Sequence, residues 1–256
     1  MIPYFPEPIL RLGVLPIHLA AVADVMAVLL SILIILRRAG RFGVSRGQIF
    51  RLWFWMYLGA MLGAHLYKAV VDDFLTFRTT PAIVFRIDLG LSTFGAGFGG
   101  LLAGAIWCRF HRLDRLDTFR RLDIMAYALP FAWLLGRFGC SLLHDHRGVA
   151  ATGFLAIHFP GGSRYDLGMI EFLFLIPMCA LFLILDRRPR AVGFFLATLG
   201  LLYGAFRVVL ETWRVNPSRV QGVVAILCGI CALVAMRAGP GTILKPAAAP
   251  TVNEIG

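Results

Sequence analysis

Charged side chains are scarce in this sequence of 256 residues, because Asp, Glu, Lys and Arg together make up only 15% of it. Soluble domains average about 25%. Hydrophobic residues make up 59%, and the mean hydropathy is +0.79. Runs of about 20 apolar residues recur, and each is long enough to cross a hydrocarbon layer of about 30 Å. The composition therefore excludes an ordinary soluble protein and predicts a polytopic membrane protein.

Seven apolar runs are expected to form transmembrane helices, so the predicted fold class is all-α. The first run is too long, and too poor in N-terminal positive charge, for a cleaved signal sequence, and we expect it to remain in the mature protein. Residues 1–238 are predicted to form one seven-helix domain and residues 239–256 a loose C-terminal tail. The runs have approximate bounds 13–36, 49–71, 90–108, 123–143, 166–185, 192–212 and 220–237.

Acidic residues are scarcer than basic ones, with 14 Asp and Glu against 25 Lys and Arg and a formal net charge of +11. In a soluble protein this charge would suggest nucleic-acid binding. Fifteen of the basic residues, however, follow odd-numbered runs, whereas eight lie in the other connections. The positive-inside rule then predicts an N-terminus outside and a C-terminus in the cytoplasm. We interpret the basic excess as orienting charge in a bacterial inner (plasma) membrane, and we expect no nucleic-acid partner.

Cysteine is also rare, with five residues in the chain. No disulfide framework is indicated, because Cys108, Cys179, Cys228 and Cys231 lie in or at the ends of apolar runs. The CxxC formed by Cys228 and Cys231 has no neighbouring His, Asp or basic activator, so redox chemistry is not expected there. We interpret these cysteines as packing residues.

Two arginines interrupt the apolar runs, Arg137 in the fourth and Arg207 in the sixth. Each costs about 2.5 to 3.5 kcal/mol at the centre of a bilayer, so each needs compensation. In a structural interpretation, ion pairs fix helix packing, since Glu211 lies one turn from Arg207 and Glu171 stands at the outer part of the fifth run. In the functional interpretation, which we favour, the two guanidinium groups grip the phosphate of a phospholipid headgroup near the outer leaflet.

Three further sequence patterns bear on the position and surroundings of a functional site. Tyr203, Arg207, Glu211 and Arg214 are spaced by four, four and three residues, so they share one stripe of a helix, which in lipid must face the protein interior. The glycine-rich segment 89–104 favours close helix packing over a lipid-accessible groove. The connection 144–165 contains several glycines and a proline, so we expect it to be irregular.

The densest cluster of reactive side chains is GRFGCSLLHDHRG, which contains Arg137. Its His-Asp-His run could suggest a metal site. Consecutive side chains diverge, however, and zinc needs ligands brought together at suitable angles. We therefore predict a solvated helix end, with no metal and no other cofactor. The polar residues that follow the arginine are Cys140, His144, Asp145, His146 and Arg147.

At these residues the chain resembles the prolipoprotein diacylglyceryl transferase family, through most of residues 13–237. GRFGCSLLHDHRG is similar to the family signature Gly-Arg-x-Gly-Asn-Phe-x-Asn-Gly-Glu followed by a Gly, with Arg137, Asp145 and Gly148 in register. YGAFRVVLETWR is similar to the family's Tyr-Gly-x-x-Arg-x-x-x-Glu element. HFPGG before Glu171, LGAMLGAH and IDLGLSTFGAGFGG are similar to further family landmarks, in the same order.

The resemblance implies transfer of a diacylglyceryl group from phosphatidylglycerol to the lipobox cysteine of prolipoproteins. The partners would be phosphatidylglycerol and the prolipoprotein signal peptide. A precursor thiolate would attack the glyceryl carbon while positive groups hold the phosphate. The candidate catalytic residues are Arg137, Asp145, Arg207, His144 and His146, and the candidate substrate-binding residues are Tyr203, Glu211, Gly148, Cys140 and Glu171.

The chain also departs from the family pattern. The family's Phe-His-Gly-Gly element begins here with Phe94 and Gly95, so its histidine is absent. In the signature, Cys140 and Leu143 replace two asparagines, His144 replaces a glycine and Asp145 replaces the glutamate.

Three functions stay open at this point. One is a transferase in which His144 or His146 stands in for the missing base. Another is a non-catalytic phospholipid-binding protein that kept the fold. The third is a transferase with a changed acceptor or donor, in which Cys140 itself is the nucleophile.

Overall fold

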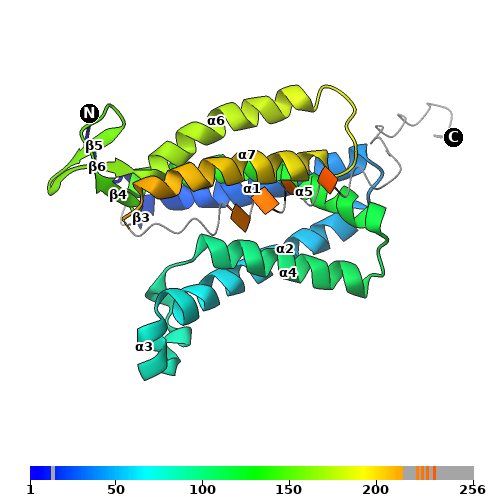
Figure 1. Ribbon diagram of the computed structural model, residues 1–256, viewed down its shortest axis with the longest axis horizontal. Coiled ribbons are helices and arrows are strands. Elements are labelled where there is room, and N and C mark those ends of the chain that lie inside the picture. Colours follow the sequence, from blue (N-terminus) through cyan, green and yellow to red (C-terminus); the bar gives the residue numbers. More distant parts are fainter. Residues whose placement is uncertain (13–14, 216–222, 225, 228, 231–232, 235–256) are drawn as a thin grey trace. The chain divides into compact units, whose positions relative to one another are not determined.

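The computed structural model describes residues 1–12, 15–215, 223–224, 226–227, 229–230 and 233–234, and helices dominate it (Figure 1). The chain divides into two compact units, one made of Met1–Phe42 and Leu122–Gly256 and the other of Gly43–Arg121. Most of the predicted run 220–237 lies outside the described residues. So do Cys228, Cys231 and the predicted tail.

Among the described residues, four helices are long and apolar enough to cross a membrane, and they overlap the first, fourth, fifth and sixth predicted runs. This confirms a helical fold of the membrane type. The count of seven crossings and the orientation of the termini stay predictions. The four helices are α1 (Leu19–Arg41), α5 (Arg115–Leu143), α6 (Leu167–Leu185) and α7 (Phe194–Leu210), the last continued by the 3-10 turn η4 (Glu211–Trp213).

The second unit contains the helices of the second and third predicted runs, which are not among those four. Its elements are α2 (Arg46–Tyr67), the π-helical turn η1 (Lys68–Asp72), α3 (Phe74–Thr79), the 3-10 turns η2 (Pro81–Phe85) and η3 (Ile87–Leu89), and α4 (Thr93–Phe110).

Helices α2 and α4 lie side by side through glycines (Figure 1). A Cβ atom added at Gly95 or Gly99 of α4 would overlap a backbone carbonyl oxygen of α2, at Gly63 and Gly59 respectively. Side chains at these positions would force the helices apart, so only glycine permits the observed approach. The close packing expected for the glycine-rich segment is present.

The connection 144–165, expected to be irregular, is instead largely sheet, and that expectation is wrong. A four-stranded sheet has the order β1-β5-β6-β4, with β1 parallel to β5 and the other pairs antiparallel. Pro160 and Gly161 form the tight turn of the β5–β6 hairpin, whereas Gly148 lies within a strand. The strands are β1 (Ile2–Pro3), β4 (Arg147–Ala150), β5 (Ala156–Phe159) and β6 (Gly162–Asp166), and a separate hairpin pairs β2 (Ile9–Leu12) with β3 (Leu15–His18).

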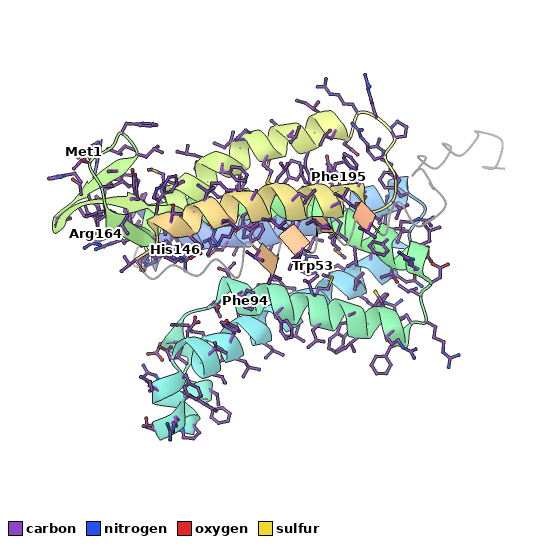
Figure 2. The ribbon with its side chains drawn as sticks, viewed as in Figure 1. Met1, Trp53, Phe94, His146, Arg164 and Phe195 are labelled. Carbon is purple, nitrogen blue, oxygen red and sulfur yellow. The ribbon has the colours of Figure 1, made fainter. Side chains whose placement is uncertain are left out.

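Buried charged groups link the helices of the first unit at the end away from the sheet. The Asp123 carboxylate accepts hydrogen bonds from the backbone N–H groups of Phe195 (2.7 Å) and Leu196 (3.0 Å), and so caps the first turn of α7. Arg38 of α1 pairs with Asp186 after α6 at 2.7 Å. Figure 2 shows Phe195 at this end of the helices and His146 at the other, where the sheet lies. An apolar core between α5, α6 and α7 fills the space between the two ends.

Candidate functional site

A buried ion-pair network joins three helices near the sheet. The Glu171 carboxylate of α6, only 2% exposed, lies 3.0 Å from Nε of Arg137 on α5 and 3.6 Å from Nη1 of Arg207 on α7. Tyr203 donates its hydroxyl hydrogen to the same carboxylate. Both guanidinium groups are therefore compensated inside the protein, as burial of a charge in an apolar domain requires.

The network continues at the C-terminal end of α7. Arg207 Nη2 lies 2.9 Å from Glu211 Oε1, and Arg214 Nε lies 3.3 Å from the same oxygen. The pKa of Arg214 is lowered, first by burial and then by repulsion from Arg207. Among the described residues, the network joins three guanidinium groups, those of Arg137, Arg207 and Arg214, through the carboxylates of Glu171 and Glu211.

The sequence spacing explains why these groups meet. Tyr203, Arg207 and Glu211 are buried, and with the half-buried Arg214 they face the interior, as the stripe predicts. Trp133 of α5 stacks on the Tyr203 ring at a centroid distance of 4.3 Å and holds it in place. Each arginine is therefore paired with a carboxylate, as the structural interpretation expects, whereas the functional interpretation stays a prediction.

An apolar groove of about 440 Å³ runs between α6 and α7 on the first unit. Phe206, which lines it, precedes Arg207 in the chain and stacks face to face on Phe174 of α6. The groove and the ion-pair network use different stripes of α7, since the groove is lined from Leu202 and Val209 and the network contains Tyr203 and Arg207. Its lining consists of Phe174, Pro177, Met178, Leu181, Leu202, Ala205, Phe206 and Val209.

His144 is buried in a structural role. Its Nδ1 faces the Asp166 carboxylate and its Nε2 donates to the backbone carbonyl of Phe5 at 3.1 Å. Both ring nitrogens are therefore engaged, and no lone pair remains for accepting a proton from a thiol. Asp166 also caps α6 by accepting from Met169 N at 3.0 Å. Sequence reasoning missed Asp166, although an Asp directly before an apolar run is a common N-cap signal.

Cys140, Asp145 and His146 converge at the end of α5, with one ligand atom from each within 4.8 Å of the others. Helix α5 ends at Leu143, and His144 adopts a left-handed conformation with φ of 51° that reverses the chain. We expected the side chains of the His-Asp-His run to diverge. His144 does point away, whereas the side chains of Asp145 and His146 lie close together. Burial lowers the pKa of His146, and the Asp145 charge opposes this shift.

Gly148 and Gly95 both stand where a side chain would collide with backbone, and the sequence predicted such packing for the segment of Gly95 only. A Cβ at Gly148 on β4 would lie 2.5 Å from the carbonyl oxygen of Trp213, so the glycine lets β4 approach the turn that carries Glu211. In the second unit, a Cβ at Gly95 would overlap both the Gly63 carbonyl and the Tyr67 side chain. The position that holds a histidine in the family pattern therefore has no room for a side chain here.

Comparison with known proteins places the chain in a family. A sequence profile described as prolipoprotein diacylglyceryl transferase matches residues 7–238. The chain is 28% identical over 233 residues to the phosphatidylglycerol–prolipoprotein diacylglyceryl transferase of Pseudomonas putida (strain W619), over 86% of this chain and 85% of the relative. It is 25% identical over 248 residues to the enzyme of that name from Cronobacter sakazakii, over 86% and 84% of the two chains. The chain therefore belongs to the prolipoprotein diacylglyceryl transferase family.

Proposed function

We propose that this protein transfers a diacylglyceryl group from phosphatidylglycerol to the lipobox cysteine thiol of prolipoproteins. The observation that carries the proposal is a cluster of three guanidinium groups, those of Arg137, Arg207 and Arg214, in the same unit as an apolar groove between α6 and α7. A phosphodiester with two acyl chains has the matching chemistry. The groove binds an acyl chain, and the guanidinium groups bind the phosphate.

The reaction increases the charge that the network must hold. When the thiolate attacks the glyceryl carbon, the phosphate changes from a singly charged diester to a more highly charged monoester in the leaving glycerol phosphate. Fixed guanidinium groups in a water-poor site stabilise this developing charge more than they stabilise the ground state. Arg207 lies between two carboxylates, Glu171 at 3.6 Å and Glu211 at 2.9 Å, which hold its guanidinium plane in place for a phosphate oxygen.

The carboxylates act as positioning residues in this scheme. Glu171 touches Arg137 and Arg207 together, and Glu211 touches Arg207 and Arg214. Each carboxylate therefore fixes the orientation of two guanidinium planes before lipid arrives, which reduces the reorganisation needed in the transition state.

We further propose that the sheet end of the first unit faces outward from a bacterial inner membrane. The arginines at the end of α1 and those between α6 and α7 gather at the opposite end, where Arg38 and Arg41 both pair with Asp186. Basic residues concentrate on the cytoplasmic side of such membranes. This orientation presents the ion-pair network to precursors on the extracytoplasmic side.

The test combines complementation with a direct assay. In cells depleted of their own transferase, the chain should restore lipoprotein maturation, and the purified protein should move label from phosphatidylglycerol to a lipobox peptide. Arg207→Gln should reduce transfer by at least about 100-fold, the loss expected when a main electrostatic stabiliser is removed. The exposed Arg188, changed to Gln, provides the control. Normal insertion without any transfer would contradict the proposal.

The absence of a side chain at Gly95 favours a second candidate, a phospholipid-binding protein without transferase activity. It keeps the arginine network and lacks the family's histidine. The two candidates differ in a single result, because the second binds phosphatidylglycerol in an Arg207-dependent manner and leaves the lipobox peptide unmodified.

A further inference from the structure

The ion-pair network does not explain how the acceptor thiol loses its proton. At neutral pH a free thiol is mostly protonated, and the thiolate is the nucleophile. Neither the family's histidine position nor His144 offers a ready base, because Gly95 has no room for a side chain and both ring nitrogens of His144 are engaged. The remaining candidate, His146, lies in a cluster with a thiol and a carboxylate.

The cluster of Cys140, Asp145 and His146 provides one thiol, one carboxylate and one imidazole within 4.8 Å of each other. These are the three ligand types that Zn²⁺ binds in proteins, and three protein ligands with a fourth position open is the arrangement of catalytic zinc sites. Among the described residues this is the only such group of three or more. Two of its members, Cys140 and Asp145, stand where the chain departs from the family signature.

The electrostatic surroundings favour a cation between these ligands. The Asp24 carboxylate of α1 lies nearby, with its Oδ1 3.5 Å from where a Gly139 Cβ would stand. The negative charges of Asp24 and Asp145 repel each other. The nearest cation, Arg137, donates to Cys140 Sγ at 3.7 Å, yet it is shared with Glu171. A divalent cation would relieve this repulsion, and the Arg137 contact would become an outer-shell hydrogen bond to the ligand sulfur.

The cluster is also accessible. The side chains of Asp145 and His146 are 44% and 39% exposed, and Figure 2 shows His146 at the sheet end of the helices. A metal held here would therefore keep a coordination position open toward an incoming peptide.

We propose that Cys140, Asp145 and His146 bind Zn²⁺ and that the open fourth position takes the cysteine thiol of the acceptor peptide. The acceptor part rests on the proposed transferase function, whereas metal binding does not. Coordination removes the thiol proton, which passes to water, and leaves a zinc-bound thiolate. Its sulfur forms a bond to the glyceryl carbon as the carbon–oxygen bond to phosphate breaks. The electron pair of that bond leaves on the oxygen of glycerol phosphate, beside the guanidinium groups of the network.

Arg137 connects the proposed zinc site with the ion-pair network. Its Nη1 faces the Cys140 sulfur while its Nε faces Glu171 in the ion-pair network. The hydrogen bond to Cys140 lowers the nucleophilicity of the protein's own sulfur, so the peptide sulfur reacts. The nucleophile and the leaving phosphate are brought to the same arginine.

The first experiment measures metal binding alone. Full-length protein, stripped with a chelator in detergent, is titrated with Co²⁺ as a spectroscopic substitute for Zn²⁺. We expect one metal ion per chain and a thiolate-to-cobalt charge-transfer band. Cys140→Ser should abolish the band, and the matched control Cys179→Ser, which removes another free thiol of the chain, should keep it. Asp145→Asn and His146→Asn should each weaken binding more than the about 10- to 100-fold typical of outer-shell changes. Absence of a band in the unmodified protein, or a band that survives Cys140→Ser, would overturn the metal site.

The second experiment measures acceptor binding to the cobalt-loaded protein. A lipobox peptide should raise the charge-transfer intensity, because it adds a second thiolate, and a peptide with serine in place of cysteine should not. An unchanged spectrum with the cysteine peptide would overturn the acceptor position. So would a lipid adduct on Cys140 found by mass spectrometry. Transfer that continues at full rate after metal removal would overturn the acceptor position on zinc and leave the transferase proposal standing. Transfer absent from metal-loaded protein would overturn the transferase proposal, and the acceptor position with it, and leave only metal binding standing.

Discussion

The glycine contact between α2 and α4 makes a quantitative prediction about Gly95. In Gly95→Ala the new Cβ overlaps the Gly63 carbonyl oxygen and the Tyr67 side chain, and the oxygen belongs to helix backbone that cannot rotate away. The two helices must separate locally, which also loosens the contact between Gly99 and Gly59. Overpacking of this kind costs about 1–3 kcal/mol.

Gly97 supplies the matched control, since it lies on the same helix and nothing stands within 4 Å of its added Cβ. Alanine improves helix propensity by about 1 kcal/mol at either position. The difference in stability between Gly97→Ala and Gly95→Ala therefore isolates the clash, and we expect Gly97→Ala to be more stable by about 1–3 kcal/mol. For a chain of this size 1 kcal/mol corresponds to about 2–4 °C in Tm.

The assay is thermal unfolding of the purified variants in one detergent. Unfolding is measured as loss of the monodisperse peak in size-exclusion chromatography after heating. Equal Tm values for the two alanine variants would refute the reasoning, because they would show that α2 and α4 tolerate a side chain at Gly95. The same reasoning applies to the histidine of the family pattern. Gly95→His should lower the Tm further and should not raise transfer above the level of the unmodified chain.

Three further predictions concern the first unit. Glu171→Gln removes the shared carboxylate and leaves buried guanidinium charge uncompensated, so it should destabilise the protein by about 3–5 kcal/mol in denaturant titrations; an unchanged midpoint would contradict the network. His144→Phe keeps the ring contacts and breaks both hydrogen bonds, so limited proteolysis should cleave the N-terminal segment faster, whereas Asp166→Asn should have a smaller effect. Gly148→Ala should lower the Tm and transfer together, because its Cβ meets Trp213, and Gly161→Ala, with open space around its Cβ, should change neither.

Hydropathy predicted the four helices that meet the membrane criteria, because apolar length is a property of the sequence alone. Helical spacing likewise predicted that Arg207 and Glu211 share a face, and they pair at 2.9 Å. These features depend on local periodicity, which can be read directly from one amino-acid sequence.

The features that sequence reasoning missed depend on contacts between distant segments or on one backbone angle. The pair of His144 and Asp166 joins residues on either side of the sheet strands, and no periodicity links them. The convergence of Cys140 with Asp145 and His146 follows from the positive φ of His144, an angle that is uncommon for residues other than glycine. The small sheet was missed because its strands are only two to five residues long.

In the proposed transferase, Arg137 couples the binding of the peptide to the binding of the lipid. One guanidinium touches the thiol of Cys140 on one side and the Glu171 carboxylate on the other, so a change of charge at either neighbour alters its position and its remaining capacity to donate. In the proposed transferase, occupancy of the peptide side and occupancy of the lipid side therefore influence each other's affinity by the same factor, whichever substrate arrives first.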